Sequence, residues 1–372
     1  MAQNAAQAGS IAGRPGGGFD RSYQHAGIAG AAVRNGRVAR AVRLGRAARR
    51  LITQEINMKP ARIVFPGFWF GQSSLQEAEE LTRRGVGGFC VYGGTAQETK
   101  DFTKRMNDLS PYGKLLFCAD IDEDLSEIVT DAPALPANET LQHFSCPQDG
   151  AYRKGNLIAR MARSMGLDWV LCPVVDLGYA PPAFSDVPLT VTHLAGDFIA
   201  GLSNGGALNC IKYFPGVSGV LKTLAQMEDA EFVPYKHIFR RADAIMPSDM
   251  IFPNIDNDHQ AMLSDRVIKG LLKKRLNYKG CVVSFPLFKG RLRYEDASAI
   301  KMLHCGVENI LAPKNASSVV DAVEKEADKG LLMDEIIHAV SNHEMFISKV
   351  YVGPEPPDIA EAFEMAKAFC KK

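Results

Sequence analysis

At 372 residues, the chain can form two or three small domains or one large barrel. Hydrophobic residues make up 46% and charged residues 23%, as in globular proteins that bury a core. The formal net charge of +1 gives no overall field that would favour nucleic acid or an acidic membrane. No apolar run reaches the roughly 18 residues that a membrane span needs. The eight cysteines contain no CxxC pair and no metal-ligand spacing, so we expect reduced core thiols in a cytoplasmic protein.

The first 57 residues differ in composition from the rest of the chain. Residues 1–50 contain nine arginines but a single acidic residue, and from Arg34 an arginine stands at every third position. Because the segment is rich in Ala, Gly and Arg and has few large apolar residues, we expect 1–57 to be a disordered extension. Three alternatives remain: an untranslated stretch upstream of a start at Met58, a targeting segment, or a basic arm for nucleic acid. No nucleic-acid partner is expected for the rest of the chain.

Beyond Met58, short apolar segments alternate with amphipathic ones. The pattern predicts strands over 61–66, 86–92, 114–119, 169–174, 207–212, 244–246, 281–284 and 308–312. It predicts helices over 74–84, 96–109, 152–165, 189–203, 234–240, 264–276, 295–303, 316–329 and 334–350. Eight strands that are each followed by a helix favour a single-domain (β/α)8 TIM-type barrel over 58–350, with a doubly wound open sheet as the alternative. Residues 351–372 are expected to form a tail with a short helix.

In such a barrel the functional side chains follow the carboxyl ends of the strands. The third strand is followed by the acidic stretch Asp120–Asp124, and the fourth leads to Asp176. The remaining candidates at strand ends are Lys212 and Tyr213, Asp249, and Phe285.

Three motifs resemble glycoside hydrolase family 3, in the subgroup of single-domain bacterial β-N-acetylhexosaminidases. They are Met165–Leu177, Lys212–Gly216, and the stretch from Met262 to Ser284, and the resemblance covers roughly residues 60–350. It implies a barrel whose relatives hydrolyse β-glycosides through a carboxylate nucleophile and a separate acid/base group.

The positions that carry family chemistry depart from the family pattern. The resemblance places an aspartate nucleophile where this chain has Phe285, and it expects an acid/base histidine in the loop after the fifth strand, where none occurs. His237 lies too far along that segment to replace it. Of the sugar-binding positions, Asp120 and Lys212 match, Leu125 replaces an arginine, and Asp249 replaces a histidine.

The first hypothesis is therefore a family 3 barrel that lacks the retaining mechanism and binds a sugar or small ligand, or acts as a scaffold. Its expected ligand-binding residues are Asp120, Lys212, Asp249, Tyr213 and Asp176, with no metal and no cofactor. The alternative is an active carbohydrate hydrolase that uses other strand-end carboxylates, namely Asp120, Asp176 and Asp249, with water as the nucleophile. A role in protein interaction without a ligand is a third hypothesis, and no oligomeric state follows from the residues.

Several of these residues also have a purely structural interpretation. Asp122–Asp124 are expected to form a solvated loop face, although their oxygens could also hold Mg²⁺ or Ca²⁺. Asp176 could cap the barrel rim, and Asp120 with Lys212 could be a buried structural ion pair. Rings at the mouth could stack on a sugar or fill the pocket; the candidates are Tyr213, Phe214, Phe285 and Phe288.

Overall fold

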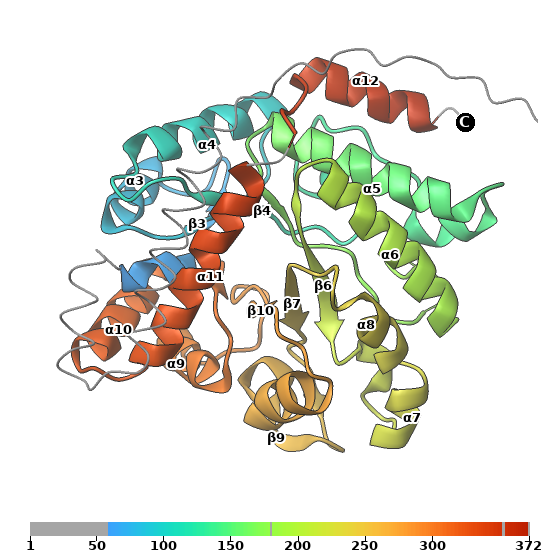
Figure 1. Cartoon of the computed structure of the whole chain (residues 1–372). Helices are drawn as coiled ribbons and strands as arrows, with labels where there is room; N and C mark the ends of the chain where they lie inside the picture. Colours follow the sequence, from blue (N-terminus) through green and yellow to red (C-terminus); the bar gives the residue numbers. More distant parts are fainter. Residues whose placement is uncertain (1–58, 179–180, 352–353, 371–372) are drawn as a thin grey trace, which may run out of the picture. The chain divides into compact units, whose positions relative to one another are not determined.

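The computed structural model describes residues 59–178, 181–351 and 354–370. The predicted extension 1–57 lies outside these residues. The described chain forms a ring of parallel strands with helices outside it (Figure 1).

Seven strands pair in the order β10-β7-β6-β5-β4-β3-β2, and β1 pairs with β11. A parallel bridge between Val283 and Asn309 joins the β10 end to β11. Because β1 and β2 are successive parts of the first strand, the described strands close into an eight-position barrel, which confirms the predicted fold class. The barrel strands are β1 (Val64–Phe65), β2 (Gly67–Trp69), β3 (Gly88–Tyr92), β4 (Leu116–Ala119), β5 (Trp169–Val170), β6 (Leu208–Phe214), β7 (Ala244–Pro247), β10 (Cys281–Val282) and β11 (Ile310–Leu311).

The outer helices agree with most of the predicted ranges. They are α3 (Leu75–Arg84), α4 (Ala96–Leu109), α5 (Pro147–Ser164), α6 (Pro188–Asn204), α7 (Leu224–Asp229), α8 (Phe232–Ile238), α9 (Glu295–Cys305), α10 (Ala316–Asp328), α11 (Met333–Tyr351) and α12 (Ile359–Cys370). Short 3₁₀ turns are η1 (Pro60–Ile63), η2 (Leu125–Glu127), η3 (Asn138–His143), η4 (Val217–Gly219) and η5 (Ala261–Leu263). A small hairpin of β8 (Ile251–Phe252) and β9 (Asp256–Gln260) follows β7.

Two helices differ from the sequence-based expectation. The helix expected from residue 152 begins five residues earlier, at Pro147, because proline is favoured in the first helical turn. The helix expected over 264–276 is a π-helix, η6 (Arg266–Arg275), in which the Leu276 N–H bonds to the Leu271 carbonyl. Its apolar side chains Val267, Ile268, Leu271 and Leu272 are buried as the pattern predicted.

Aromatic side chains fill both the interior of the barrel and the layer between strands and helices. Phe65 of β1 meets Trp169 of β5 with ring centroids 6.0 Å apart, a contact across the ring of strands. Outside the ring, Phe102 of α4 stacks on Phe68 of β2 at 4.0 Å. Continuous apolar strands therefore bury both faces, as expected of a parallel barrel.

Most of the cysteines are buried, as expected of core thiols, and the C-terminal segment contains a helix. Six cysteines are buried and free, while Cys146 and Cys370 are exposed and free. The short helix expected within 351–372 is α12, which lies beside α5 (Figure 1). Phe369 of α12 packs against the Phe144 ring at 6.1 Å and under the Arg153 guanidinium at 5.2 Å.

Phe214 corrects one expectation about the barrel mouth. It was expected among the rings at the mouth, but it is fully buried and packs on Phe232 and Tyr235, with centroids 6.1 and 5.2 Å away. Because side chains alternate along a strand, Phe214 points into the layer beneath α8.

We predict that Phe214→Ala lowers the free energy of unfolding by about 3–5 kcal/mol, the usual cost of deleting a buried phenyl ring. Leu221, which is 91% exposed, provides the control. Leu221→Ala should change the free energy of unfolding by less than about 0.5 kcal/mol in the same urea titration. Equal effects of the two substitutions would contradict the burial of Phe214.

Candidate functional site

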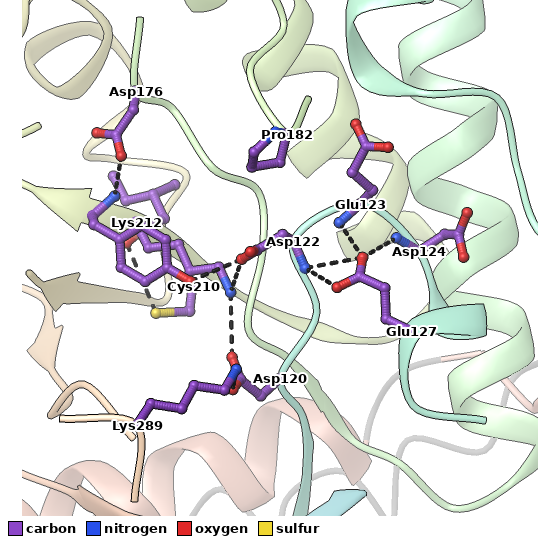
Figure 2. A network of polar contacts seen from close by, with 12 residues as sticks. Asp120, Asp122, Glu123, Asp124, Glu127, Asp176, Pro182, Cys210, Lys212 and Lys289 are labelled. Atoms are coloured by element: carbon purple, nitrogen blue, oxygen red, sulfur yellow. Dashed lines mark hydrogen bonds and ion pairs between the residues drawn. The ribbon is translucent and has the colours of Figure 1, made fainter. Parts of the chain in front are cut away.

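A buried ammonium lies at the centre of the barrel mouth. Lys212, near the end of β6, is fully buried, and its Nζ lies 3.3 Å from Asp120 Oδ1 and 2.7 Å from Asp122 Oδ1. Both aspartates follow β4, which ends at Ala119, so the barrel brings the two strand ends together as predicted. Figure 2 shows the lysine between the two carboxylates.

Two further groups complete the coordination of Asp120. Lys289 Nζ lies 2.7 Å from Asp120 Oδ2, and the Tyr92 hydroxyl donates to the same oxygen at 3.3 Å. Burial raises the pKa of Asp120, but the Lys212 and Lys289 ammoniums outweigh burial and hold it below its usual value. Burial likewise lowers the pKa of Lys212, while Tyr213 and the two carboxylates raise it well above normal. Asp120 and Lys212 therefore carry opposite charges at neutral pH.

An aromatic pair stands beside this network. The Tyr213 hydroxyl donates to Asp122 Oδ1 at 2.8 Å, and its ring lies 5.0 Å from Lys212 Nζ. On the other side, the half-buried Phe285 ring is 5.6 Å from the Tyr213 ring. The exit of β10 therefore presents a phenyl ring packed on a phenol ring.

The segment after Phe285 is held over the same end of the barrel. The Phe288 ring makes edge contacts with Trp69 and Tyr92, which stack on each other, at centroid distances of 4.9 and 5.2 Å. The N–H groups of Leu287 and Phe288 bond to the carbonyls of Leu311 and Ala312. These contacts place Lys289 beside Asp120. Lys289 was not predicted from the sequence, although its position four residues after Phe285 at a strand exit could have indicated a place at the barrel mouth.

The expectation that Asp122–Asp124 form a solvated loop face is wrong. Asp122 pairs with Lys212, Glu123 accepts the Asn138 N–H, and Asp124 is buried and caps η2. The carboxylate of Glu127 accepts the backbone N–H groups of all three acidic residues. Figure 2 shows Glu123 and Asp124 turned away from Lys212, so this acidic run folds its own loop.

Beneath the loop that follows β6, a second pair of carboxyl groups is buried. Asp176 accepts the Tyr213 N–H at 3.4 Å, and Glu231 accepts from Lys222 at 2.6 Å and Ser218 at 2.8 Å. Among the described residues, Asp176 Oδ1 and Glu231 Oε2 have no hydrogen-bond partner. Gly216 has a φ of 104°, and a Cβ there would approach Glu231 Cγ to 3.1 Å, which explains the glycine.

Burial raises the pKa of Asp176 to about 7, with the neighbouring acids Asp122 and Glu231 adding to the effect. The Tyr213 and Val217 N–H groups act in the opposite direction. Asp176 therefore stabilises the loop after β6 through a hydrogen bond to its backbone. Glu231 was not predicted from the sequence because it lies at the far end of this long loop.

The remaining candidates lie apart from the Lys212 network. Asp249, two residues past β7, is half-buried and makes no ion pair among the described residues. His237 lies on α8 as expected, is exposed, and has its Nδ1 2.7 Å from the Val233 carbonyl oxygen. Within the described ranges, no group of three or more His, Cys, Asp or Glu side chains is placed to hold a metal ion. No helix there is long and apolar enough to cross a membrane.

The closed parallel barrel, with charged side chains after the carboxyl ends of its strands, places the protein among the (β/α)8 TIM-type barrels. The family model for the glycosyl hydrolase family 3 N terminal domain matches residues 55–343, and the chain belongs to this family.

Relatives with known names are distant in sequence. A β-hexosaminidase from Photobacterium profundum is 23% identical over 273 residues, which cover 68% of this chain and 81% of the relative. The solved structure of a family 3 β-N-acetylglucosaminidase from Paenibacillus sp. superposes with a TM-score of 0.72 at 19% identity, covering 84% of this chain and 67% of that one. NagZ from Neisseria gonorrhoeae gives a TM-score of 0.65 at 20% identity, over 84% and 99% of the two chains. These structures share the fold.

The raised pKa of Asp176 predicts a specific pH dependence of stability. Because the folded state binds this proton more tightly than the unfolded chain, stability falls as pH rises from about 4 to about 7. A shift of about three pH units corresponds to a loss on the order of 4 kcal/mol.

Asp176→Asn keeps an oxygen for the Tyr213 N–H but cannot ionise, so its stability should fall less over this range. Urea titrations of both proteins between pH 4 and pH 8 provide the measurement. Parallel pH profiles for wild type and variant would show that Asp176 does not titrate in this way.

Proposed function

We propose that this family 3 barrel binds a saccharide or a similar polyhydroxylated ligand at its mouth and does not carry out retaining glycoside hydrolysis. The observation that carries the proposal is the contrast between two strand exits. Asp120 and Lys212 lie 3.3 Å apart at the ends of β4 and β6, whereas the exit of β10 bears Phe285 packed on Tyr213. A carboxylate beside an ammonium can recognise a hydroxyl as acceptor and donor. Both side chains are buried, and the half-exposed Lys289 on Asp120 is the group that a ligand would displace to reach them.

The loss of hydrolysis is supported by the chemistry of the side chains present. A phenyl ring has no atom that can form the covalent glycosyl intermediate of a retaining mechanism. The ring packs on Tyr213, whose hydroxyl already donates to Asp122. Burial raises the pKa of Tyr213, so the phenol stays protonated at neutral pH.

The alternative of hydrolysis by Asp120, Asp176 and Asp249 receives less support. An inverting mechanism needs one protonated carboxyl group and one carboxylate that both reach the substrate. Asp120 is held ionised by two ammoniums, and Asp176 is buried under the β6 loop. Asp249 alone combines partial exposure with the absence of an ion-pair partner among the described residues.

We predict that the wild type does not turn over 2,4-dinitrophenyl β-glycosides, whose leaving group departs without an acid catalyst. Phe285→Asp returns a carboxylate to the strand exit and should release measurable dinitrophenolate, while Phe285→Asn, which is similar in size and cannot form the ester, should not. Clear turnover by the wild type, at more than about 10³ times the rate without enzyme, would contradict the proposal.

A second prediction concerns Lys289, which occupies one oxygen of Asp120. Lys289→Ala frees that oxygen, so the affinity for N-acetylglucosamine should rise by up to about fivefold, because a half-exposed ion pair contributes about 0.2–1 kcal/mol. Calorimetric titration of wild type and variant measures the change.

Two variants control this experiment. Lys104→Ala removes an exposed ion pair with Asp108 on α4 and should leave the affinity unchanged. Asp120→Asn should weaken binding, because its amide cannot offer two acceptor oxygens. An unchanged affinity in Asp120→Asn would show that the ligand does not bind at Asp120 and Lys212.

A further inference from the structure

The loops after β10 and β11 carry basic side chains that the binding proposal does not use. Arg291 and Arg293 follow the anchored residue Lys289, and Lys314 follows β11. All three are exposed. The N–H groups of Lys314 and Asn315 bond to the carboxylate of Glu295, the first residue of α9, at 2.8 and 3.3 Å, so the two loops adjoin. We call Arg291, Arg293 and Lys314 the basic rim.

Neither arginine of the basic rim makes an ion pair with a described residue. Arginines on the outer helices do: Arg84 binds Asp321 and Glu324, Arg105 binds Glu79, and Arg275 binds Glu228. The next acids along the chain are Glu295, which accepts two backbone N–H groups through one oxygen, and Asp296, which accepts the Ala297 N–H; neither forms an ion pair with Arg291 or Arg293 among the described residues. The guanidiniums of the basic rim are therefore available to an external anion.

The basic rim is also held in place relative to the mouth. Phe288 packs edge-on against the stacked rings of Trp69 and Tyr92, and Lys289, only two residues before Arg291, is paired with Asp120. Leu292, between the two arginines, packs against the core, and the Arg293 guanidinium lies 5.3 Å from the Tyr294 ring centroid. Such anchoring lowers the entropy cost of binding an anion next to Asp120.

We propose that the ligand of this barrel is an acidic saccharide whose anionic substituent, a sulfate or a phosphate, is bound by Arg291 and Arg293 while ring hydroxyls contact Asp120 and Lys212. This inference rests on the proposed binding function and adds the chemical class of the ligand. Guanidinium groups suit tetrahedral oxyanions because they donate two parallel hydrogen bonds.

The test compares chitobiose, a neutral disaccharide, with its two mono-6-O-sulfated and two mono-6-O-phosphorylated forms. At 50 mM salt, at least one charged form should bind the wild type about three- to tenfold more tightly than chitobiose, since each exposed ion pair contributes a few-fold. That advantage should shrink at 300 mM salt because the charges are screened. Comparing sulfate with phosphate identifies which oxyanion is preferred.

The double variant Arg291→Ala/Arg293→Ala should lose this advantage and keep the affinity for chitobiose. The control variant Lys236→Ala/Arg240→Ala removes two exposed charges at or just after α8 and should keep the preference for the charged disaccharide. If chitobiose binds and no charged form is preferred, or if the preference survives in the Arg291/Arg293 variant, the acidic-ligand inference fails and the binding function stands. If no saccharide binds, both fail.

Discussion

The ammonium of Lys212 is the charge on which the barrel mouth depends. It is removed from solvent at the end of β6, and such a cation is tolerated only with close anionic partners, here Asp120 and Asp122 after β4. Asp120 in turn binds Lys289 from the β10 loop and Tyr92 from β3. One buried charge thereby joins side chains from four strands.

In the function that we propose, the same network serves ligand recognition and not catalysis. Its carboxylates are held ionised by ammoniums, which suits hydroxyl binding but leaves no proton to donate. Asp176, a carboxyl group with a pKa of about 7, is enclosed beneath the β6 loop, where it packs against the turn at Gly216. Membership of glycosyl hydrolase family 3 accounts for the scaffold, while the exit of β10 bears Phe285 packed on Tyr213.

Most of the fold could be predicted from the sequence, because apolar strands and amphipathic helices alternate with clear caps; α4 begins and ends where the pattern predicted. The rule that strand ends carry function brought Asp120 and Lys212 together correctly. What could not be predicted depends on contacts between loops distant in sequence. Lys289 meets Asp120 across 169 residues, and Glu127 bonds to the backbone of the acidic run. Phe214 was misplaced because its strand continues past the expected end.

The most direct test of the central claim is a crystal structure of the wild-type protein soaked with chitobiose for hours at neutral pH. The account predicts an intact disaccharide with ring hydroxyls on Asp120 and Lys212 and with the Lys289 side chain displaced from Asp120. Cleaved N-acetylglucosamine in the mouth would contradict the absence of hydrolysis, and a disaccharide bound away from Asp120 and Lys212 would contradict the assignment of the site.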